Sequence, residues 1–349
     1  LIKVKPMASE KNLLLGIGNP LLDISAHVEL DLLKKYDLKE KSAILAEDKH
    51  LPLYEEMIKG YKVEYIAGGA TQNSIRAAQW MLQGQGKTHF IGCIGKDDFG
   101  KELSSAASGS GVNTHYQYVD KFPTGTCAVL VHNSDRTLVA NLGAANHYDK
   151  THFDSDEIQE VLNSVETFYA AGFFLTVSTN TLVALGEHAV KHEKTFAFNI
   201  SAEFLVHVFG EQLNKVLPFV DLLFANEVEM AAYGKSQDWG DDLKEITKKL
   251  AAEPTKGNRT RMVITTRGPD SAYVSEGGSD IVEYPATKVP ADEIVDVNGA
   301  GDAFVGGFLS VWVQEKNIKK AMHAGHYAAS VCIRASGATF PEKPQCSFN

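Results

Sequence analysis

Short apolar runs alternate with longer amphipathic stretches along most of this chain. Leu13 to Ile17 is one such run, and it ends at the turn-forming residues Gly18-Asn19-Pro20. This alternation of strand and helix patterns predicts an α/β fold with a mostly parallel central sheet covered by helices. Strands are expected at 13–17, 89–94, 167–171, 196–200, 222–225 and 262–265, and helices at 71–82, 155–165, 180–192, 211–217, 240–252, 300–315 and 318–335.

Two stretches interrupt this alternation. Residues 23–65 are charged and amphipathic, and residues 116–141 contain runs in which apolar and polar residues alternate, such as 127–131. An alternation of period two is typical of antiparallel strands with one solvated face. We interpret both stretches as parts of one small α/β lid. The remaining residues, 13–22, 66–115 and 142–344, are expected to form the large domain.

The composition is that of an ordinary globular enzyme and argues against two other classes of protein. The 349 residues carry a net charge of −10, whereas a protein that wraps nucleic acid needs a basic surface. No apolar run approaches the roughly 20 residues that span a bilayer. The four cysteines have no metal-binding spacing, so reduced thiols in the cytoplasm are expected. Residues 1–6 precede Met7 and are interpreted as vector-derived.

The strongest chemical motif is the loop Asn298-Gly299-Ala300-Gly301-Asp302, which leads directly into an apolar helix. Small residues at a helix N-terminus leave backbone N–H groups open to an anion, and the helix dipole favours negative charge there. A carboxylate at Asp302 can accept the proton of an alcohol. Anion donors beside a base are the two parts that phosphoryl transfer needs. A simple helix cap is the competing interpretation of Asp302.

Two further clusters place polar side chains beside glycines or strand ends. Asn19 and Asp23 follow the first strand at its carboxyl end, where open α/β sheets bind ligands, and a carboxylate there can hold a vicinal diol. Gly68 and Gly69 allow a ligand to approach the backbone, and Asn73 lies one turn inside the helix that follows them. Taken singly, each cluster also fits an ordinary turn or helix start.

Asn226 and Glu229 form a last cluster after the strand at 222–225. Residues three apart share one face of a helix, so this pair could hold water or Mg²⁺ beside phosphate groups. A capping Asn with a Glu in the first turn is the plain alternative, and it is a common pattern.

The order of these motifs resembles the ribokinase-like family of small-molecule kinases. The motifs read Gly-Asn-Pro-Leu-Leu-Asp, Gly-Gly-Ala-Thr-Gln-Asn, Asn-Glu-Val-Glu and Asp-Val-Asn-Gly-Ala-Gly-Asp, at 18–23, 68–73, 226–229 and 296–302. The last of them identifies only the broad family. The runs around Asn73, Phe174 and His326 are similar to the adenosine branch, and the resemblance extends from residue 13 to residue 343.

The resemblance implies ATP-dependent phosphorylation of adenosine at the 5′-hydroxyl, giving AMP and ADP in purine salvage. It assigns the base to Asp302, and the stabilisation of the transferring group to Gly299, Ala300, Gly301 and Arg136. It places the substrate against Asn19, Asp23, Gly68, Gly69, Asn73, Cys127, Leu138, Ala140, Phe174, Phe204 and Asn298. It places ATP near Asn226, Thr266, Gly268 and His326, with Mg²⁺ organised by Glu229 through water.

The resemblance also implies a lid that closes over the substrate, a monomer, and a cytoplasmic location with the nucleus as a second site. K⁺ is a candidate activator. The chain departs from the family at Arg267 and Val297, where Gln and Thr are usual, and Glu203 interrupts the familiar run before Phe204. We expect Arg267 to alter contacts on the ATP side.

Three alternatives stay open at this stage. A kinase for a sugar or another nucleoside shares the same motifs. A nicotinamide-dependent oxidoreductase is suggested by Gly16-x-Gly18, but position 21 is Leu21, so the third glycine of the dinucleotide motif is missing. A catalytically silent nucleoside-binding protein would need to have lost the use of Asp302.

Overall fold

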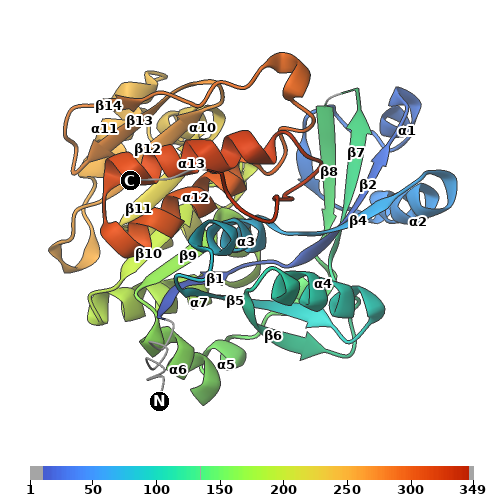
Figure 1. Ribbon diagram of the computed structural model, residues 1–349, viewed down its shortest axis with the longest axis horizontal. Helices are drawn as coiled ribbons and strands as arrows, with labels where there is room; N and C mark the ends of the chain where they lie inside the picture. Colours follow the sequence, from blue (N-terminus) through green and yellow to red (C-terminus); the bar gives the residue numbers. More distant parts are fainter. Residues whose placement is uncertain (1–10, 134, 346–349) are drawn as a thin grey trace, which may run out of the picture.

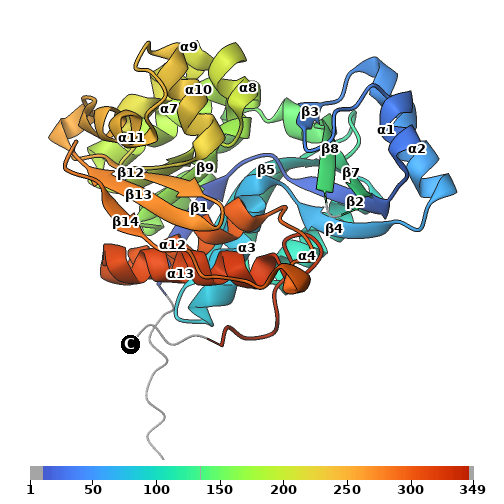
Figure 2. The same cartoon turned by 90° about the horizontal axis from the view of Figure 1, so that it is seen from above.

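The computed structural model describes residues 11–133 and 135–345, so the interpretations of residues 1–6 and of Cys346 fall outside it. Within that part, the strands form a nine-stranded sheet and a five-stranded sheet, which lie side by side (Figures 1 and 2). Among the described helices, none combines the length and the apolar character needed to cross a membrane.

The large sheet confirms the predicted α/β architecture. Its strand order is β14-β13-β12-β11-β10-β9-β1-β5-β6, and all neighbours from β12 to β6 are parallel. Its central strands are almost fully buried apolar runs, because helices cover both faces. The bounds are β1 Asn12–Ile17, β5 Lys87–Gly95, β6 Asn113–Val119, β9 Thr167–Ala171, β10 Thr195–Asn199, β11 Leu222–Asn226, β12 Met262–Arg267, β13 Asp270–Glu276 and β14 Val282–Tyr284.

Two hydrophobic cores lie on opposite faces of this sheet (Figure 2). One core is covered by α3 Ala70–Leu82, α4 Asp98–Gly109, α12 Ala300–Glu315 and α13 Ile318–Cys332. The other is covered by α5 Lys150–Phe153, α6 Asp156–Ser164, α7 Leu175–Lys191, α8 Glu203–Val208, α9 Gly210–Val216, α10 Glu227–Ser236 and α11 Leu243–Ala252. Helices α3 and α12, which carry Asn73 and Asp302 in their first turns, therefore pack on the same face, whereas α10, which starts at the Asn226–Glu229 motif, packs on the other.

A second, smaller sheet is present, as the predicted fold class requires, and we call this sheet and its helices the lid. Its order is β3-β8-β7-β2-β4, with bounds β2 Leu21–His27, β3 Ala43–Leu45, β4 Glu64–Gly68, β7 Thr126–His132 and β8 Asp135–Asn141. β7 and β8 are antiparallel, as their alternating pattern predicts. Helices α1 Leu30–Lys35 and α2 Leu51–Gly60 cover one face. The opposite face carries a smaller apolar cluster of Leu21, Cys127, Val129 and Val131.

Three chain segments differ from the predicted lid boundaries, 23–65 and 116–141. β2 begins at Leu21, and β4 continues to Gly68. β6 extends to Val119 and pairs with β5, so residues 116–119 belong to the large sheet. The sequence pattern of β6 is misleading because β6 is an edge strand, in which Tyr116 is buried and the other residues are partly or fully exposed. The division into two domains remains our interpretation.

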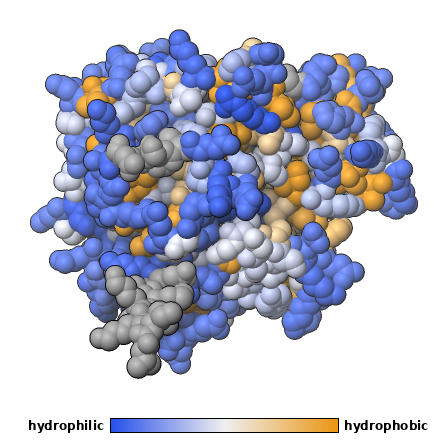
Figure 3. All heavy atoms as spheres, viewed as in Figure 1, coloured by the Kyte–Doolittle hydropathy of each residue, from blue (hydrophilic) through white to orange (hydrophobic). Residues whose placement is uncertain are grey.

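The surface agrees with the polar composition. Figure 3 shows hydrophilic residues over most of one face, with small and separate hydrophobic areas. Cys93, Cys127 and Cys332 are buried and free, as expected of reduced thiols.

Candidate active site

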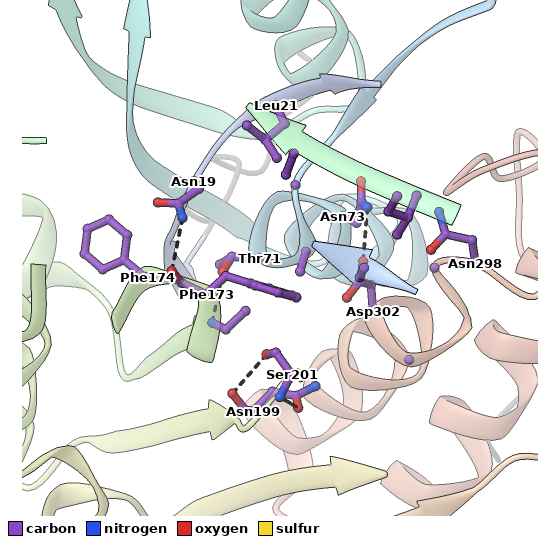
Figure 4. Close-up of a pocket in the computed structure, with 18 of the residues that line it drawn as sticks. Asn19, Leu21, Thr71, Asn73, Phe173, Phe174, Asn199, Ser201, Asn298 and Asp302 are labelled. Carbon is purple, nitrogen blue, oxygen red and sulfur yellow. Dashed lines mark hydrogen bonds between the residues drawn. The ribbon is translucent and has the colours of Figure 1, made fainter. Parts of the chain in front are cut away.

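A cavity of about 340 Å³ lies where the lid meets the carboxyl ends of the central strands. Its walls come from lid strands β2, β3, β7 and β8, from the ends of β9, β10 and β11, and from the first turns of α3, α10 and α12. This is the edge at which open α/β sheets bind ligands. The close-up in Figure 4 shows the polar side chains of Asn19, Asn73, Asn199 and Asp302 around it.

The first turn of α12 carries the predicted anion-binding loop. Gly299 precedes the helix with φ of +78°, a conformation that glycine adopts without strain. A Cβ atom built at Gly301 would meet no atom within 4 Å, so the backbone there is open to the cavity. Gly299 and Gly301 line the cavity, whereas Ala300 does not, and its N–H donates to the Val297 carbonyl at 3.3 Å. Helix starts of this kind bind anions through backbone N–H groups.

Asp302 faces the cavity from the same turn. Asn73 Nδ2 on α3 donates a hydrogen bond to Asp302 Oδ2 at 3.1 Å (Figure 4). Burial among protein atoms raises the pKa of Asp302 to about 7, and the Asn73 hydrogen bond opposes this rise. The N-cap position of α12 is Gly299, and the side-chain hydrogen bond found at Asp302 goes to Asn73 and not to the helix backbone, which does not favour the helix-cap interpretation. A carboxylate with a pKa near neutrality is suited to accept a proton.

Asn19 and Asp23 lie at the start of the lid, Asn19 just before β2 and Asp23 within it. Asn19 Nδ2 donates to the Phe173 carbonyl at 3.2 Å. Burial raises the pKa of Asp23 to about 7, with Arg136 acting in the opposite direction. Gly68 lies outside the cavity lining but directly behind Asp23, and a side chain at this glycine would collide with the Asp23 carboxylate. Gly69 lines the cavity with φ of +93°.

Another part of the cavity wall is apolar on both sides. Cys127, Leu138 and Ala140 project from β7 and β8 of the lid, and Phe174 and Phe204 lie on the large-domain side. The rings of Phe204 and Phe173 are 6.2 Å apart. Phe204 therefore lines the cavity, where the family resemblance placed it. A flat, largely apolar ligand matches such a slot.

Asn226 and Glu229 lie at the start of α10, at one end of the cavity. They form a reciprocal cap: Asn226 Oδ1 accepts from the Glu229 N–H at 2.9 Å, and Glu229 Oε2 accepts from the Asn226 N–H at 3.0 Å. Burial raises the pKa of Glu229 to about 7. Thr266 and Asn298 also line the cavity. Across residues 11–133 and 135–345, no group of three or more His, Cys, Asp or Glu side chains is placed to hold a metal.

Arg136, Gly268 and His326 do not line the cavity. The Arg136 guanidinium forms an ion pair with Asp296, Nε to Oδ1 at 2.5 Å, and the two side chains are 8% and 0% exposed. Gly268, with φ of +52°, lies between β12 and β13. His326 packs on Phe304 within the α12–α13 core, and burial lowers its pKa to about 4.

Arg267 also has a structural contact that its sequence position did not indicate. Its guanidinium lies 4.0 Å from the centre of the Tyr273 ring, and Nε donates to the Ser271 carbonyl at 2.8 Å. The β12–β13 hairpin therefore holds this side chain.

Several lining residues escaped the sequence analysis. Ala43, Ile44 and Leu45 come from β3, a strand that was not predicted. Asn199 ends β10 and Ser201 follows it, and Ser201 has φ of +73°, which is rare for a residue with a side chain. Their position after a predicted parallel strand was the available signal for these two, because ligands bind at carboxyl strand ends.

Comparison with known proteins shows the family to which the chain is similar. The chain matches the pfkB family carbohydrate kinase profile over residues 31–346. It is 47% identical to adenosine kinase 2 of Arabidopsis thaliana over 97% of this chain and 99% of that protein. It is 46% identical to adenosine kinase of Dictyostelium discoideum over 96% and 98%.

Solved structures are similar over the same extent. Adenosine kinase of Anopheles gambiae, in complex with P1,P4-di(adenosine-5) tetraphosphate, superposes with a TM-score of 0.92 at 44% identity and covers 96% of this chain and 99% of its own. Adenosine kinase of Schistosoma mansoni, in complex with adenosine and AMP, gives a TM-score of 0.88 at 31% identity, with 95% and 98% covered. On this evidence, the chain belongs to the pfkB family of carbohydrate kinases.

Proposed function

We propose that this protein transfers the γ-phosphoryl group of ATP to the 5′-hydroxyl of adenosine, giving AMP and ADP. The observation that carries the proposal is the position of Asp302, which lies beside an open helix N-terminus at one end of a cavity whose other walls are largely apolar. The identity of 46–47% with adenosine kinases over almost the whole chain supports the choice of acceptor.

The acceptor nucleoside fits the cavity with its ribose toward α3. Asp23 and Asn19 present a carboxylate and an amide that can hold the ribose hydroxyls. A side chain at Gly69 would collide with the Asn19 carbonyl, so the glycine lets these two backbones pack closely at the cavity wall. The purine would then lie between the lid wall and the phenylalanines, Cys127, Leu138 and Ala140 facing Phe174 and Phe204. This orientation directs the 5′-hydroxyl toward Asp302 at the start of α12 and Asn73 at the start of α3.

Asp302 then acts as the general base. Its carboxylate accepts the proton of the 5′-hydroxyl while that oxygen forms a bond to the γ-phosphorus, and the bond from this phosphorus to the bridging oxygen breaks to release ADP. The open N–H groups around Gly299 and Gly301 stabilise the charge of the transferring group. Closure of the lid excludes water and so limits the hydrolysis of ATP.

The ATP side of the site is assigned by the same reasoning. Asn226 and Thr266 line the cavity at the ends of neighbouring strands, and Gly268 and His326 remain expected contacts of the nucleotide. The buried Glu229 carboxylate, already hydrogen-bonded to Asn226, fits a role in which it holds the waters of Mg²⁺. Bound Mg²⁺ would neutralise phosphate charge. Activation by K⁺ and the monomeric state remain predictions.

Product analysis tests the proposal directly. The purified protein is incubated with ATP, Mg²⁺ and one acceptor at a time, namely adenosine, inosine, guanosine or ribose, and the phosphorylated products are separated by anion-exchange chromatography. We expect AMP and ADP in equal amounts from adenosine. Efficient phosphorylation of ribose without turnover of adenosine would instead identify a sugar kinase, and ATP hydrolysis alone would contradict the proposal.

A further inference from the structure

Arg136 and Asp296 join the lid to the catalytic loop. Arg136 lies on β8 of the lid, and Asp296 lies just before the loop that starts α12. Their side chains form the buried ion pair described above, with 8% and 0% of their surfaces exposed. A buried ion pair has a large desolvation cost, so it persists where its geometry is held by further hydrogen bonds.

Asp296 has those hydrogen bonds, and both come from backbone groups near the site. Its Oδ1 atom accepts from the N–H of Asn298 at 2.9 Å, and its Oδ2 atom accepts from the N–H of Gly337 at 2.7 Å. The first bond fixes the turn that leads into Gly299 and the anion-binding start of α12. One carboxylate therefore holds the lid arginine and the loop at the same time.

The lid side of this contact reaches the same segment of the large domain. Arg136 Nη2 donates to Ser336 Oγ at 3.0 Å. A Cβ atom at the neighbouring Gly337 would lie 3.2 Å from the side chain of Ile66, which belongs to lid strand β4. Two lid strands thus meet residues 336–337, beside the Asp296 carboxylate.

We propose that Asp296 is a positioning residue, which assembles the phosphoryl-transfer site by holding Arg136 of the lid against the loop at 296–299. In this arrangement, closure of the lid and formation of the anion-binding turn are a single event. The kinetic part of this inference rests on the proposed function. The sequence motifs gave no sign that Arg136 and Asp296 are in contact.

The kinetic test is a double-mutant cycle with Asp296→Asn, Arg136→Gln and the combined variant. Each single variant should lower kcat about 10²-fold, because small displacements of a transfer site have effects of this size. The KM for adenosine should change much less. The combined variant should be no slower than the slower single variant, since residues that act as one unit are not additive.

Two further variants separate positioning from general stability. Arg334→Gln is the matched control, because Arg334 forms an exposed ion pair with Glu293 at 2.7 Å in the same region, and it should retain wild-type kcat. Arg136→Lys restores the charge and should recover part of the loss. Multiplicative losses in the cycle, or wild-type kcat for a folded Asp296→Asn, would overturn the proposal. If Asp296→Asn does not fold, Arg136→Lys and Ser336→Ala take its place.

A measurement without substrate keeps the inference independent of the proposed function. Amide hydrogen exchange of the full chain is compared among wild type, Arg136→Gln and Arg334→Gln. The proposal requires faster exchange in β8 and in the segment 336–339 for Arg136→Gln only. Unchanged exchange in both segments refutes the coupling, even where the wild type phosphorylates adenosine. Conversely, if the wild type does not phosphorylate adenosine, the exchange measurement still tests the coupling, because it needs no substrate.

Discussion

The two halves of the cavity differ in the chemical groups that they present to a ligand. The lid half presents side chains, Cys127, Leu138 and Ala140 among them, from the face of a sheet. The large-domain half has apolar rings as well, those of Phe174 and Phe204, but it adds backbone at the start of α12 and the carboxylates of Asp302 and Glu229, whereas Asp23 is the carboxylate of the lid half. Apolar side chains recognise shape by burial, whereas helix starts and carboxylates act on charge and protons.

This difference separates recognition from chemistry. A change in the lid half should alter how tightly the acceptor binds, because uniform binding affects KM. A change at the start of α12 should alter kcat, since its groups act on the charge that develops during transfer. The variants below are arranged to test this separation.

Asp302→Asn should have the largest effect. The amide cannot accept the hydroxyl proton, so kcat should fall about 10²–10⁴-fold while the fold and the affinity for adenosine are retained. The measurements are steady-state kinetics and adenosine binding by calorimetry. Asp292→Asn, a change of the same kind at an exposed residue, is the control. A near-normal kcat for Asp302→Asn would remove this residue from the mechanism.

The pH dependence of the wild type should follow the ionisation of Asp302. Burial raises its pKa to about 7, and only the ionised carboxylate is a base. The value of kcat/KM should therefore rise about tenfold per pH unit below 7 and level off above it. Initial rates between pH 5.5 and about 9 measure this profile.

Two other cavity carboxylates, Asp23 and Glu229, also have pKa values raised to about 7, and they could contribute to the same profile. The slope should persist in Asp23→Asn and disappear from the residual activity of Asp302→Asn. A slope that survives in Asp302→Asn would assign the ionisation to another group.

Leu138→Ala tests the lid half. The change removes three carbons of the apolar wall, at about 0.8 kcal/mol per fully buried carbon, so KM for adenosine should rise about 10- to 60-fold with little change in kcat. Leu51→Ala is the matched control, because Leu51 is exposed on lid helix α2, away from the cavity. An equal loss of kcat and no change of KM would contradict the separation of the two halves.

Tyr54→Phe should have the smallest effect and should leave catalysis unchanged. The Tyr54 hydroxyl donates a buried hydrogen bond to the Val139 carbonyl at 2.7 Å, within the lid. Its loss should lower the free energy of unfolding by about 1 kcal/mol, as measured by chemical denaturation. Tyr65→Phe, at an exposed tyrosine of β4, should have no such effect. Loss of activity in Tyr54→Phe would show that lid packing and chemistry are not separate.

The sequence was most informative where local pattern and chemistry coincide. Glycines that lead into an apolar helix predicted the start of α12, and the alternating runs predicted β7 and β8. It was least informative for contacts between distant segments. The partner of Arg136 is Asp296, 160 positions away, and no local periodicity encodes that pairing. The short strand β3 was missed because three residues are too few to establish an alternation.

The parallel pairing of β2 with β7 has a consequence for folding. Leu22 pairs with Thr126, and the chain between them includes α3, β5, α4 and β6 of the large domain. Closing so long a loop costs chain entropy, which is recovered only after the intervening elements are in place. We therefore expect the lid sheet to be completed late in folding, templated by the domain on which it later closes.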